Sequence, residues 1–308
     1  MLSERAGLVA LAALLVLTAG CKGRSTPRVK GAGVRVKDDL GNTVALARPA
    51  RRIASLSPSN TEVLFALGCG GAVVLRDKVS SYPPAARKIP ATSPFTLSVE
   101  HVAGYSPEVV LLSHADKAQI DAFRRVGLPV ATFDPRNLDQ VYGNVSAIGS
   151  LCGAGARAAA LVARMKKHAA RIMTAVKGRR RPTVYIETDG ADPAKPWTAG
   201  KGSFVDYIVG LAGGKNLLGR INRPFVQINA EEVLAADPDH VLLMGVSGTT
   251  RGRGQALLRA RPGWGKLRAV KQGKVIDVIH PDLISRPGPR LVQGLEGLAT
   301  ALHPEAFK

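Results

Sequence analysis

Seven short apolar runs, rich in β-branched residues, recur along the chain and are separated by amphipathic stretches. They read RIASLS (52–57), AVVLR (72–76), VVLLS (109–113), VATFD (130–134), TVYIET (183–188), HVLLMG (240–245) and KVIDVI (274–279). Near-continuous apolar strands of this kind are typical of parallel sheets that helices cover on both faces. The pattern therefore predicts an α/β fold.

A helical period dominates the stretch between the fourth and fifth runs, residues 156–178. Its interior contains neither proline nor glycine, and apolar residues stand at positions 158, 161, 162, 165, 169, 172, 173 and 176. Spacings of three and four place these residues on one stripe of a helix. About 22 residues at 1.5 Å each make a rod of roughly 33 Å. Such a rod would connect two lobes rigidly.

An internal repeat divides the chain around this helix. The segment EHVAGYSPEVVLL begins at Glu100, and EEVLAADPDHVLL begins at Glu231, with Glu, Val, Pro, Val, Leu and Leu at the same offsets. Ser98 and Asn229, each two residues ahead of the acid, are residue types that cap helices. The repeat predicts two similar lobes, residues 35–155 and 179–308, joined by the helix and with a ligand cleft between them.

The segment HPDLISRPGPR (280–290) follows the last apolar run directly. Ligand crevices of parallel sheets lie beyond the carboxyl ends of the strands, so Asp282 and Arg286 are candidates for the cleft. Prolines restrict the backbone that presents them. The alternative is a local salt bridge that braces a loop. Arg290, at the start of a predicted helix over 291–302, is interpreted as structural.

The first 21 residues have the layout of a secretory signal, with a short basic start and an apolar run too short to cross a bilayer. Their ending LTAGC resembles the lipobox of bacterial lipoproteins, which implies lipid attachment at Cys21 and a place in the periplasm or cell envelope. Residues 22–34 have the polar composition of a flexible tether. Export permits a disulfide between Cys69 and Cys152, although both could be small buried side chains instead.

The net charge of +20 would first suggest nucleic acid, but an exported chain with 5% aromatic residues has few platforms for bases. We expect no nucleic-acid partner, and the cationic clusters fit solvated loops or an anionic membrane surface. The segments GGKN (213–216) and AGKGS (199–203) lack the full phosphate-loop spacing, GVSGT (245–249) lacks that of a nucleophile elbow, and the histidines form no close pair. A binding protein without catalytic residues, metal or cofactor is therefore predicted.

Five segments carry a family resemblance in the right order. They are residues 38–68, SSYPPAARKIP (80–90), LAGGKN (211–216), RPGWGKLRAVKQGKV (261–275) and RPGPRLVQGLEGLATALHPEAF (286–307). Together they resemble the periplasmic substrate-binding proteins of metal-chelate ABC importers. The resemblance implies two lobes of Rossmann-like type, a rigid connecting helix and a ligand held between the lobes: cobalamin, haem or a ferric siderophore.

The chain is most similar to the cobalamin-binding branch of that family. There, an Asp and an Arg four residues later reach the ligand, which corresponds to Asp282 and Arg286, and aromatic side chains pack on the corrin ring. The positions that match those aromatics are Tyr82, Phe95, Trp197 and Phe225. Phe225 stands where the branch has tryptophan. A haem ligand would instead use Tyr82 or His280 as an axial ligand.

The same resemblance assigns a partner to the repeated acids. In the family, one glutamate per lobe meets arginines of the membrane permease, which corresponds here to Glu100 and Glu231. The expected partners are thus an ABC importer permease with its ATPase, a small metal chelate, and a membrane reached through the lipid anchor. We expect the receptor to be a monomer. A lipoprotein enzyme or scaffold that reuses the fold is the alternative from another class.

Overall fold

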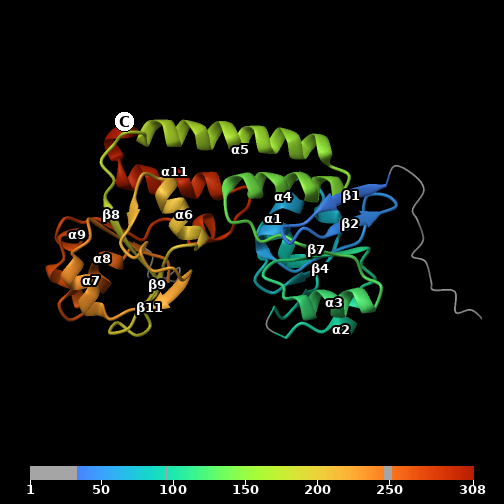
Figure 1. The fold of residues 1–308 in the computed structure, drawn as a ribbon, viewed down its shortest axis with the longest axis horizontal. Coiled ribbons are helices and arrows are strands. Elements are labelled where there is room, and N and C mark those ends of the chain that lie inside the picture. The colour runs from blue at the N-terminus through green and yellow to red at the C-terminus, as the bar shows by residue number, and fades with distance from the viewer. Residues whose placement is uncertain (1–32, 95, 246–251) are drawn as a thin grey trace, which may run out of the picture.

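The computed structural model describes residues 33–94, 96–245 and 252–308. Two α/β lobes lie side by side, and α5 (Gly155–Val176) runs along one side of both (Figure 1). This architecture confirms the predicted fold class. The predicted signal peptide, Cys21 and most of the predicted tether fall outside the described residues. Val34, the last residue assigned to the tether, begins strand β1.

The N lobe contains a fully parallel sheet in the order β5-β4-β3-β6-β7. Its strands are β3 (Ile53–Ser55), β4 (Val73–Asp77), β5 (Ala91–Thr92), β6 (Val109–Leu112) and β7 (Val130–Thr132), and an antiparallel hairpin of β1 (Val34–Lys37) and β2 (Thr43–Leu46) precedes them. The helices are α1 (Pro58–Ala66), α2 (Val99–Gly104), α3 (Lys117–Arg125) and α4 (Leu138–Leu151), with 3-10 turns at Gly70–Ala72 and Pro84–Lys88.

The C lobe contains a mixed sheet, whereas the sequence predicted a parallel one. Its order is β11-β9-β8-β12-β13, with β10 also paired to β8, and β9 is antiparallel to both β8 and β11. Only residues 190–196 join β8 to β9, and a connection that short cannot hold the crossover that parallel neighbours require. The strands are β8 (Thr183–Asp189), β9 (Trp197–Ala199), β10 (Lys215–Asn216), β11 (Phe225–Gln227), β12 (His240–Leu243) and β13 (Val275–Ile276).

Helices of the C lobe surround this sheet. They are α6 (Phe204–Leu211), α7 (Ala230–Ala236), α8 (Gly254–Ala260), α9 (Arg268–Lys271), α10 (Asp282–Ser285) and α11 (Leu291–Leu302), with 3-10 turns at Trp264–Lys266 and Pro304–Ala306. The terminal helix α11 has the bounds that the sequence predicted. The short helix α10 lies inside the proline-containing segment 280–290, for which the sequence had predicted no helix.

The internal repeat corresponds to the same supersecondary unit in both lobes. Strands β6 and β12 start at residues 109 and 240, and all four residues of each are buried. The helices before them are capped as predicted: the Ser98 hydroxyl accepts from the His101 amide at 3.1 Å, and the Asn229 side chain accepts from the Glu231 amide at 3.1 Å. The repeat therefore identified a corresponding interior strand in each lobe, since β6 lies between β3 and β7 and β12 lies between β8 and β13.

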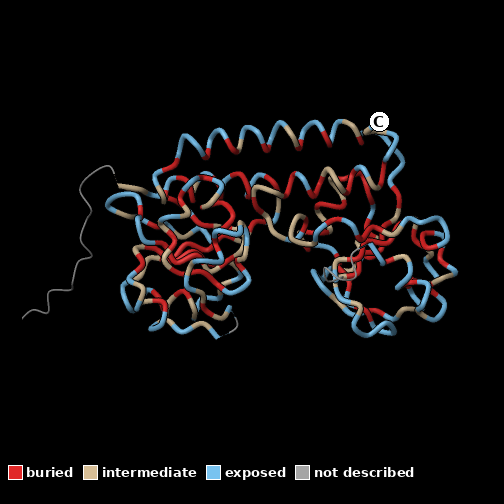
Figure 2. Tube along the Cα trace, turned by 180° about the vertical axis from the view of Figure 1, so that it is seen from behind, coloured by how far each residue is buried: buried red, intermediate tan, exposed pale blue. Residues whose placement is uncertain are grey.

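Helix α5 packs against α4 of the N lobe and α11 of the C lobe. Its buried residues include Leu161, Met165 and Ile172, which lie on the predicted stripe. Met173 is 38% exposed although the pattern placed it there, because it lies at the edge of the stripe, about 80° from its centre at 3.6 residues per turn. The outer face of α5 is exposed along its length (Figure 2). No helix formed by the described residues is long and apolar enough to cross a bilayer.

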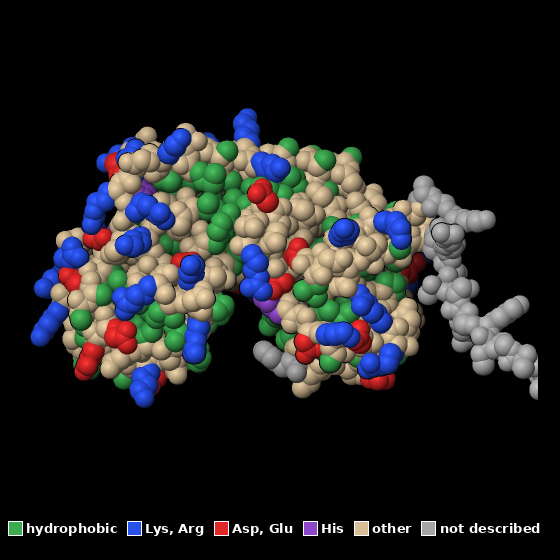
Figure 3. All heavy atoms as spheres, viewed as in Figure 1, with side chains coloured by type: hydrophobic (Ala, Val, Ile, Leu, Met, Phe, Trp, Pro, Cys, Tyr) green, Lys and Arg blue, Asp and Glu red, His purple; other side chains and the backbone are tan. Residues whose placement is uncertain are grey.

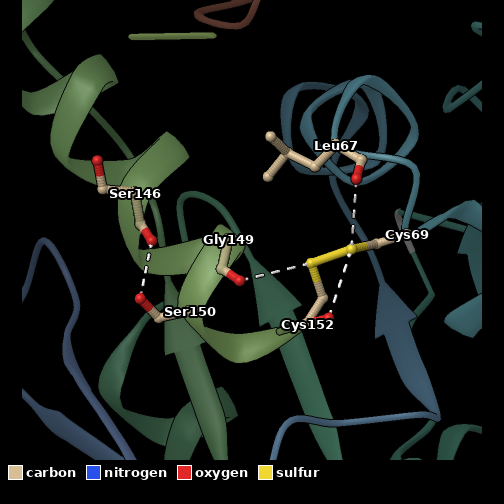
Figure 4. The surroundings of a disulfide bond; sticks show 6 residues. All are labelled: Leu67, Cys69, Ser146, Gly149, Ser150 and Cys152. Carbon is tan, nitrogen blue, oxygen red and sulfur yellow. Dashed lines mark hydrogen bonds between the residues drawn. A yellow bond between two sulfur atoms is a disulfide. The ribbon is translucent and has the colours of Figure 1, made fainter. Parts of the chain in front are cut away.

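A disulfide joins Cys69 to Cys152, with a Cα–Cα distance of 6.2 Å (Figure 4). Cys69 follows α1, and Cys152 caps the C-terminus of α4 just before α5 begins. The sulfur of Cys69 lies 3.8 Å from the Leu67 carbonyl oxygen and 3.6 Å from that of Cys152. The bond thus ties the end of α1 to the junction from which α5 leaves the N lobe.

Candidate functional site

A recess separates the two lobes on the side away from α5 (Figure 3). The loop that carries Tyr82 follows the carboxyl end of β4, and α10, which carries Asp282, follows that of β13. Both sites lie where open parallel sheets bind ligands. The structure thus brings residues of the two lobes together at their facing edges.

Two buried residues at the end of β4 fix the loop that holds Tyr82. The Arg76 guanidinium donates to the carbonyl oxygens of Asp77 at 2.8 Å and Ala86 at 2.9 Å. The Asp77 carboxylate accepts from the amide of Ser80 at 2.9 Å and from its hydroxyl at 2.6 Å. Buried hydrogen bonds of this density hold a loop in one conformation. Tyr82 projects from it, 40% exposed.

Glu62 of the N lobe holds Arg290 of the C lobe. Arg290 Nε donates to one carboxylate oxygen of Glu62 at 2.8 Å and Nη2 to the other at 2.5 Å, and Glu62 is 4% exposed. Burial disfavours the charge on Arg290, but the hydrogen bonds and charge of Glu62 outweigh it and raise the pKa of Arg290. The guanidinium also lies 3.5 Å from the Tyr82 ring centroid. Arg290 was predicted to be structural, and in the structure it forms a contact between the two lobes.

Asp282 and Arg286 form a salt bridge with each other, as the alternative to ligand binding had supposed. Arg286 Nε lies 3.1 Å from Asp282 Oδ1. Arg286 also reaches the N lobe, where Nη2 donates to the Val79 carbonyl at 3.4 Å. Its Nη1 is buried, 3.9 Å from Glu62 Oε1, and no described atom accepts a hydrogen bond from it. An unused buried donor costs about 1–3 kcal/mol. Contact of this pair with a ligand stays a prediction, and the unused donor marks where an acceptor would gain most.

Trp197 and Phe225 lie on one face of the ribbon formed by β9 and β11. The register pairs Trp197 with Gln227 and Phe225 with Ala199, and side chains of opposed and alternate residues share a face. The two aromatics are 43% and 52% exposed. Their strands lie on the side of the C lobe nearer the N lobe (Figure 1). Phe95, the fourth predicted aromatic, lies outside the described residues.

His280 lies at the edge of the same region, two residues before Asp282. Its Nδ1 accepts from the Asp282 amide at 3.2 Å, and its side chain is 52% exposed. Nε2 is then the ring nitrogen that carries the proton or binds a partner. Within the described part of the chain, no three His, Cys, Asp or Glu side chains converge as a metal site would require.

Glu100 and Glu231 are both exposed, in the first turns of α2 and α7. The hydrogen bond from its own backbone amide and the one that the Ser98 hydroxyl donates at 2.9 Å hold the pKa of Glu100 below its usual range. Both helices lie away from α5, one in each lobe (Figure 1). A partner that contacted both acids would sense the two lobes at once.

Comparison with known proteins decides the family. A family model described as periplasmic binding protein matches residues 53–281. The chain belongs to this family. The periplasmic binding protein is 30% identical to the uncharacterized ABC transporter substrate-binding lipoprotein YvrC of Bacillus subtilis, over the full length of both chains. It is 29% identical to a cobalamin-binding protein of Halobacterium salinarum, over 96% of this chain and 83% of that one.

Solved structures agree with this membership. The apo form of the periplasmic heme-binding protein RhuT from Roseiflexus sp. RS-1 superposes with a TM-score of 0.73 at 27% identity, covering 83% of this chain and 99% of that one. The two-lobed periplasmic binding protein is thus the substrate-binding component of an ABC importer. Sequence reasoning had suggested this role from the ordered segments.

Several residues that organise the site were missed by sequence reasoning. Glu62, Arg76 and Asp77 are charged yet buried. Glu62 stands within the apolar helix α1, and Arg76 and Asp77 end an apolar strand. Charged residues are rarely buried without a partner, so a charge inside an apolar run was the available signal. It identified neither the partner nor the role.

Proposed function

We propose that this receptor binds a corrinoid of the cobalamin type between its lobes and delivers it unchanged to an ABC importer. Three aromatic side chains on elements at the facing edges of the lobes, Tyr82, Trp197 and Phe225, are 40% to 52% exposed, and flat apolar rings are what such side chains contact best. This exposure is the observation that carries the proposal. The cobalamin-binding relative in Halobacterium salinarum supports it.

Polar groups of the same region would set the orientation of the ligand. Arg286 Nη1 is a donor without a described acceptor, and its partner Asp282 is an acceptor at the same edge. Peripheral amides and the phosphate of a corrinoid offer both kinds of group. Because the Glu62–Arg290 pair and α5 already join the lobes, we expect closure on binding to be small.

The receptor would deliver its ligand by docking on the membrane permease of the importer. Glu100 and Glu231 would pair with arginines of the permease, since charge-assisted pairs of this type give register and specificity more than affinity. Lipid attached to Cys21 would hold the monomeric receptor at the cell envelope, within reach of the permease. The protein would perform no covalent chemistry on the ligand.

Haem is the second candidate, favoured by one specific observation. His280 accepts a hydrogen bond at Nδ1, which leaves Nε2 of an exposed ring as the atom that could bind iron, and the structurally similar RhuT is a heme-binding protein. A ferric siderophore is the third, for which the cations Arg286 and Arg290 would serve an anionic ligand. The three ligands differ in spectrum and in the residues they need.

Calorimetric titration with cyanocobalamin and with hemin tests the assignment. We expect saturable heat at micromolar cyanocobalamin, and absence of that heat would overturn the corrinoid proposal. A Soret band on addition of hemin, lost in both Tyr82→Ala and His280→Ala, would establish haem instead. Leu40→Ala, which shortens an apolar side chain that is 54% exposed on the β1–β2 turn, is the matched control and should change neither titration.

A further inference from the structure

The outer face of α5 is cationic and lacks acids entirely. Between Asp139 and Glu187 the sequence contains no aspartate or glutamate. The same stretch contains nine basic residues: Arg157, Arg164, Lys166, Lys167, Arg171, Lys177, Arg179, Arg180 and Arg181. Figure 3 shows Lys and Arg side chains along the edge that α5 forms. Five of the nine lie within α5 and Lys177 caps its C-terminus, so part of the net charge of +20 is carried by this long helix.

Some of these cations are neutralised by the body of the protein. Arg171 pairs with Glu296 at 2.5 Å, Arg179 with Glu305 at 2.9 Å and Arg180 with Asp239 at 3.1 Å. Arg164, Lys167 and Lys177 are exposed, and within the described part of the chain no acid pairs with them. These three charges remain available for an external partner.

The surface between the free cations suits a flat partner. Ala160, Ala163, Ala170 and Thr174, all exposed and small, lie among these cations on the outer face of the helix. Alanine side chains let a planar surface approach the backbone, while long Lys and Arg side chains reach around them. The helix spans about 33 Å at 1.5 Å per residue, which is a footprint for an extended surface rather than for a small anion.

We propose that this outer face of α5 binds an anionic phospholipid bilayer. Clusters of basic residues close to a membrane are attracted by its negative surface potential. Strand β1 packs against α4, which underlies α5, so the chain enters the fold near this helix. Residues 21–33 span at most about 40 Å when extended, and a lipid on Cys21 would keep the bilayer within that distance. The proposed anchor strengthens the contact, but the charge of the face does not depend on it.

Membrane contact through α5 has a functional consequence. The recess opens on the side away from α5 (Figure 3). Helices α2 and α7, which carry Glu100 and Glu231, also lie away from α5 (Figure 1). A receptor that rests on α5 presents its recess to the surrounding solution. Docking through Glu100 and Glu231 then requires release from the bilayer, so lipid and permease compete for the orientation of the receptor.

Cosedimentation with vesicles tests the proposal without the lipid anchor. A chain that starts at Lys22 keeps every described element, since the first of them begins at Val34. We expect it to bind phosphatidylcholine vesicles that contain about one third phosphatidylglycerol, to ignore pure phosphatidylcholine, and to be released by about 0.5 M salt. Absence of binding to the anionic vesicles would overturn the proposal.

Charge-reversal variants locate the binding face. Arg164→Glu with Lys167→Glu and Lys177→Glu should weaken vesicle binding at least about tenfold, and the corresponding three Gln substitutions should have a smaller effect of the same sign. The control replaces Lys88, Lys266 and Lys271, which are exposed elsewhere, by Glu and changes the net charge equally. Equal loss in both triples would show attraction by net charge alone and would refute a site on α5. Titration with cyanocobalamin should be the same for both triples, which keeps this test separate from that of the proposed ligand.

Discussion

The guanidinium of Arg290 lies 3.5 Å from the centre of the Tyr82 ring, so a C-lobe cation covers an N-lobe aromatic. Glu62 fixes that cation through two hydrogen bonds of 2.8 and 2.5 Å. One face of Tyr82 is therefore occupied by the protein, and a ligand ring can stack only on the other. The same three residues link the two lobes.

Breaking this link by Arg290→Met should strongly destabilise the protein. The substitution removes both hydrogen bonds that Arg290 donates to the buried Glu62 carboxylate and leaves it only the more distant Arg286, whose Nη1 lies 3.9 Å from Oε1. Breaking a buried ion pair costs up to about 3–5 kcal/mol. Urea unfolding measures the loss, and Glu62→Gln added to Arg290→Met should restore part of it. Arg48→Met removes an exposed pair with Glu108 and should cost less than about 1 kcal/mol. Equal effects of Arg48→Met and Arg290→Met would contradict the role of the inter-lobe pair.

Replacing Cys69 and Cys152 together by serine should lower the free energy of unfolding by about 2–5 kcal/mol. The bond joins residues 83 apart, so it restricts a large loop of the unfolded chain. Denaturant unfolding with and without a reductant makes the measurement. The reductant should destabilise the wild type and leave the double variant unchanged; unaltered stability of the wild type after reduction would refute the expectation.

Glu100→Arg combined with Glu231→Arg should abolish transport and leave ligand affinity unchanged. Both side chains are exposed in helices away from α5, so their loss removes a docking contact and no packing. Uptake by cells and calorimetric affinity of the purified protein supply the two readouts. Asp139→Arg with Glu232→Arg, which reverses two other exposed acids in first helical turns, is the control and should retain uptake. Parallel loss of affinity and uptake in the first pair would mean that the acids are structural.

Trp197→Ala and Phe225→Ala should each weaken ligand binding by about tenfold or more. A half-exposed aromatic gains its remaining burial, and hence its contribution, only when a ring covers it. Isothermal titration of each variant gives the affinity, and thermal melting of the free protein checks that the fold is intact. Unchanged affinity in both variants would remove the β9–β11 ribbon from the binding site.

His240 should make the wild type lose stability between about pH 6.5 and pH 4. Burial in the first place, and nearby Lys274 in the second, lower its pKa to about 4. The unfolded chain then takes up a proton at a higher pH than the folded chain, so stability is complete above the unfolded pKa and falls as the pH drops towards the folded one. His240→Gln should reduce this loss by up to about 3 kcal/mol, measured by urea unfolding across the range. His101→Gln, at an exposed histidine, should leave the pH profile as it is.

Local patterns predicted the elements because each depends on neighbours in the chain. The seven apolar runs became β3, β4, β6, β7, β8, β12 and β13, and the stripe of α5 was predicted to within two residues at each end. The repeat located the matching interior strands β6 and β12, and the caps Ser98 and Asn229 followed from residue type alone. A strand or a helix buries one face wherever it packs, so its apolar residues recur at the spacing of that face.

Only the tertiary structure decided which charges meet. Glu62 and Arg290 are 228 residues apart, and no spacing rule relates positions in different lobes. The antiparallel direction of β9 and the pairing of Cys69 with Cys152 were equally undetermined, since both depend on where the chain returns in space. The sequence by itself determined the α/β class, the two lobes and the connecting helix. The packing of the lobes decided the inter-lobe link, because a buried charge is tolerated only where folding brings its partner.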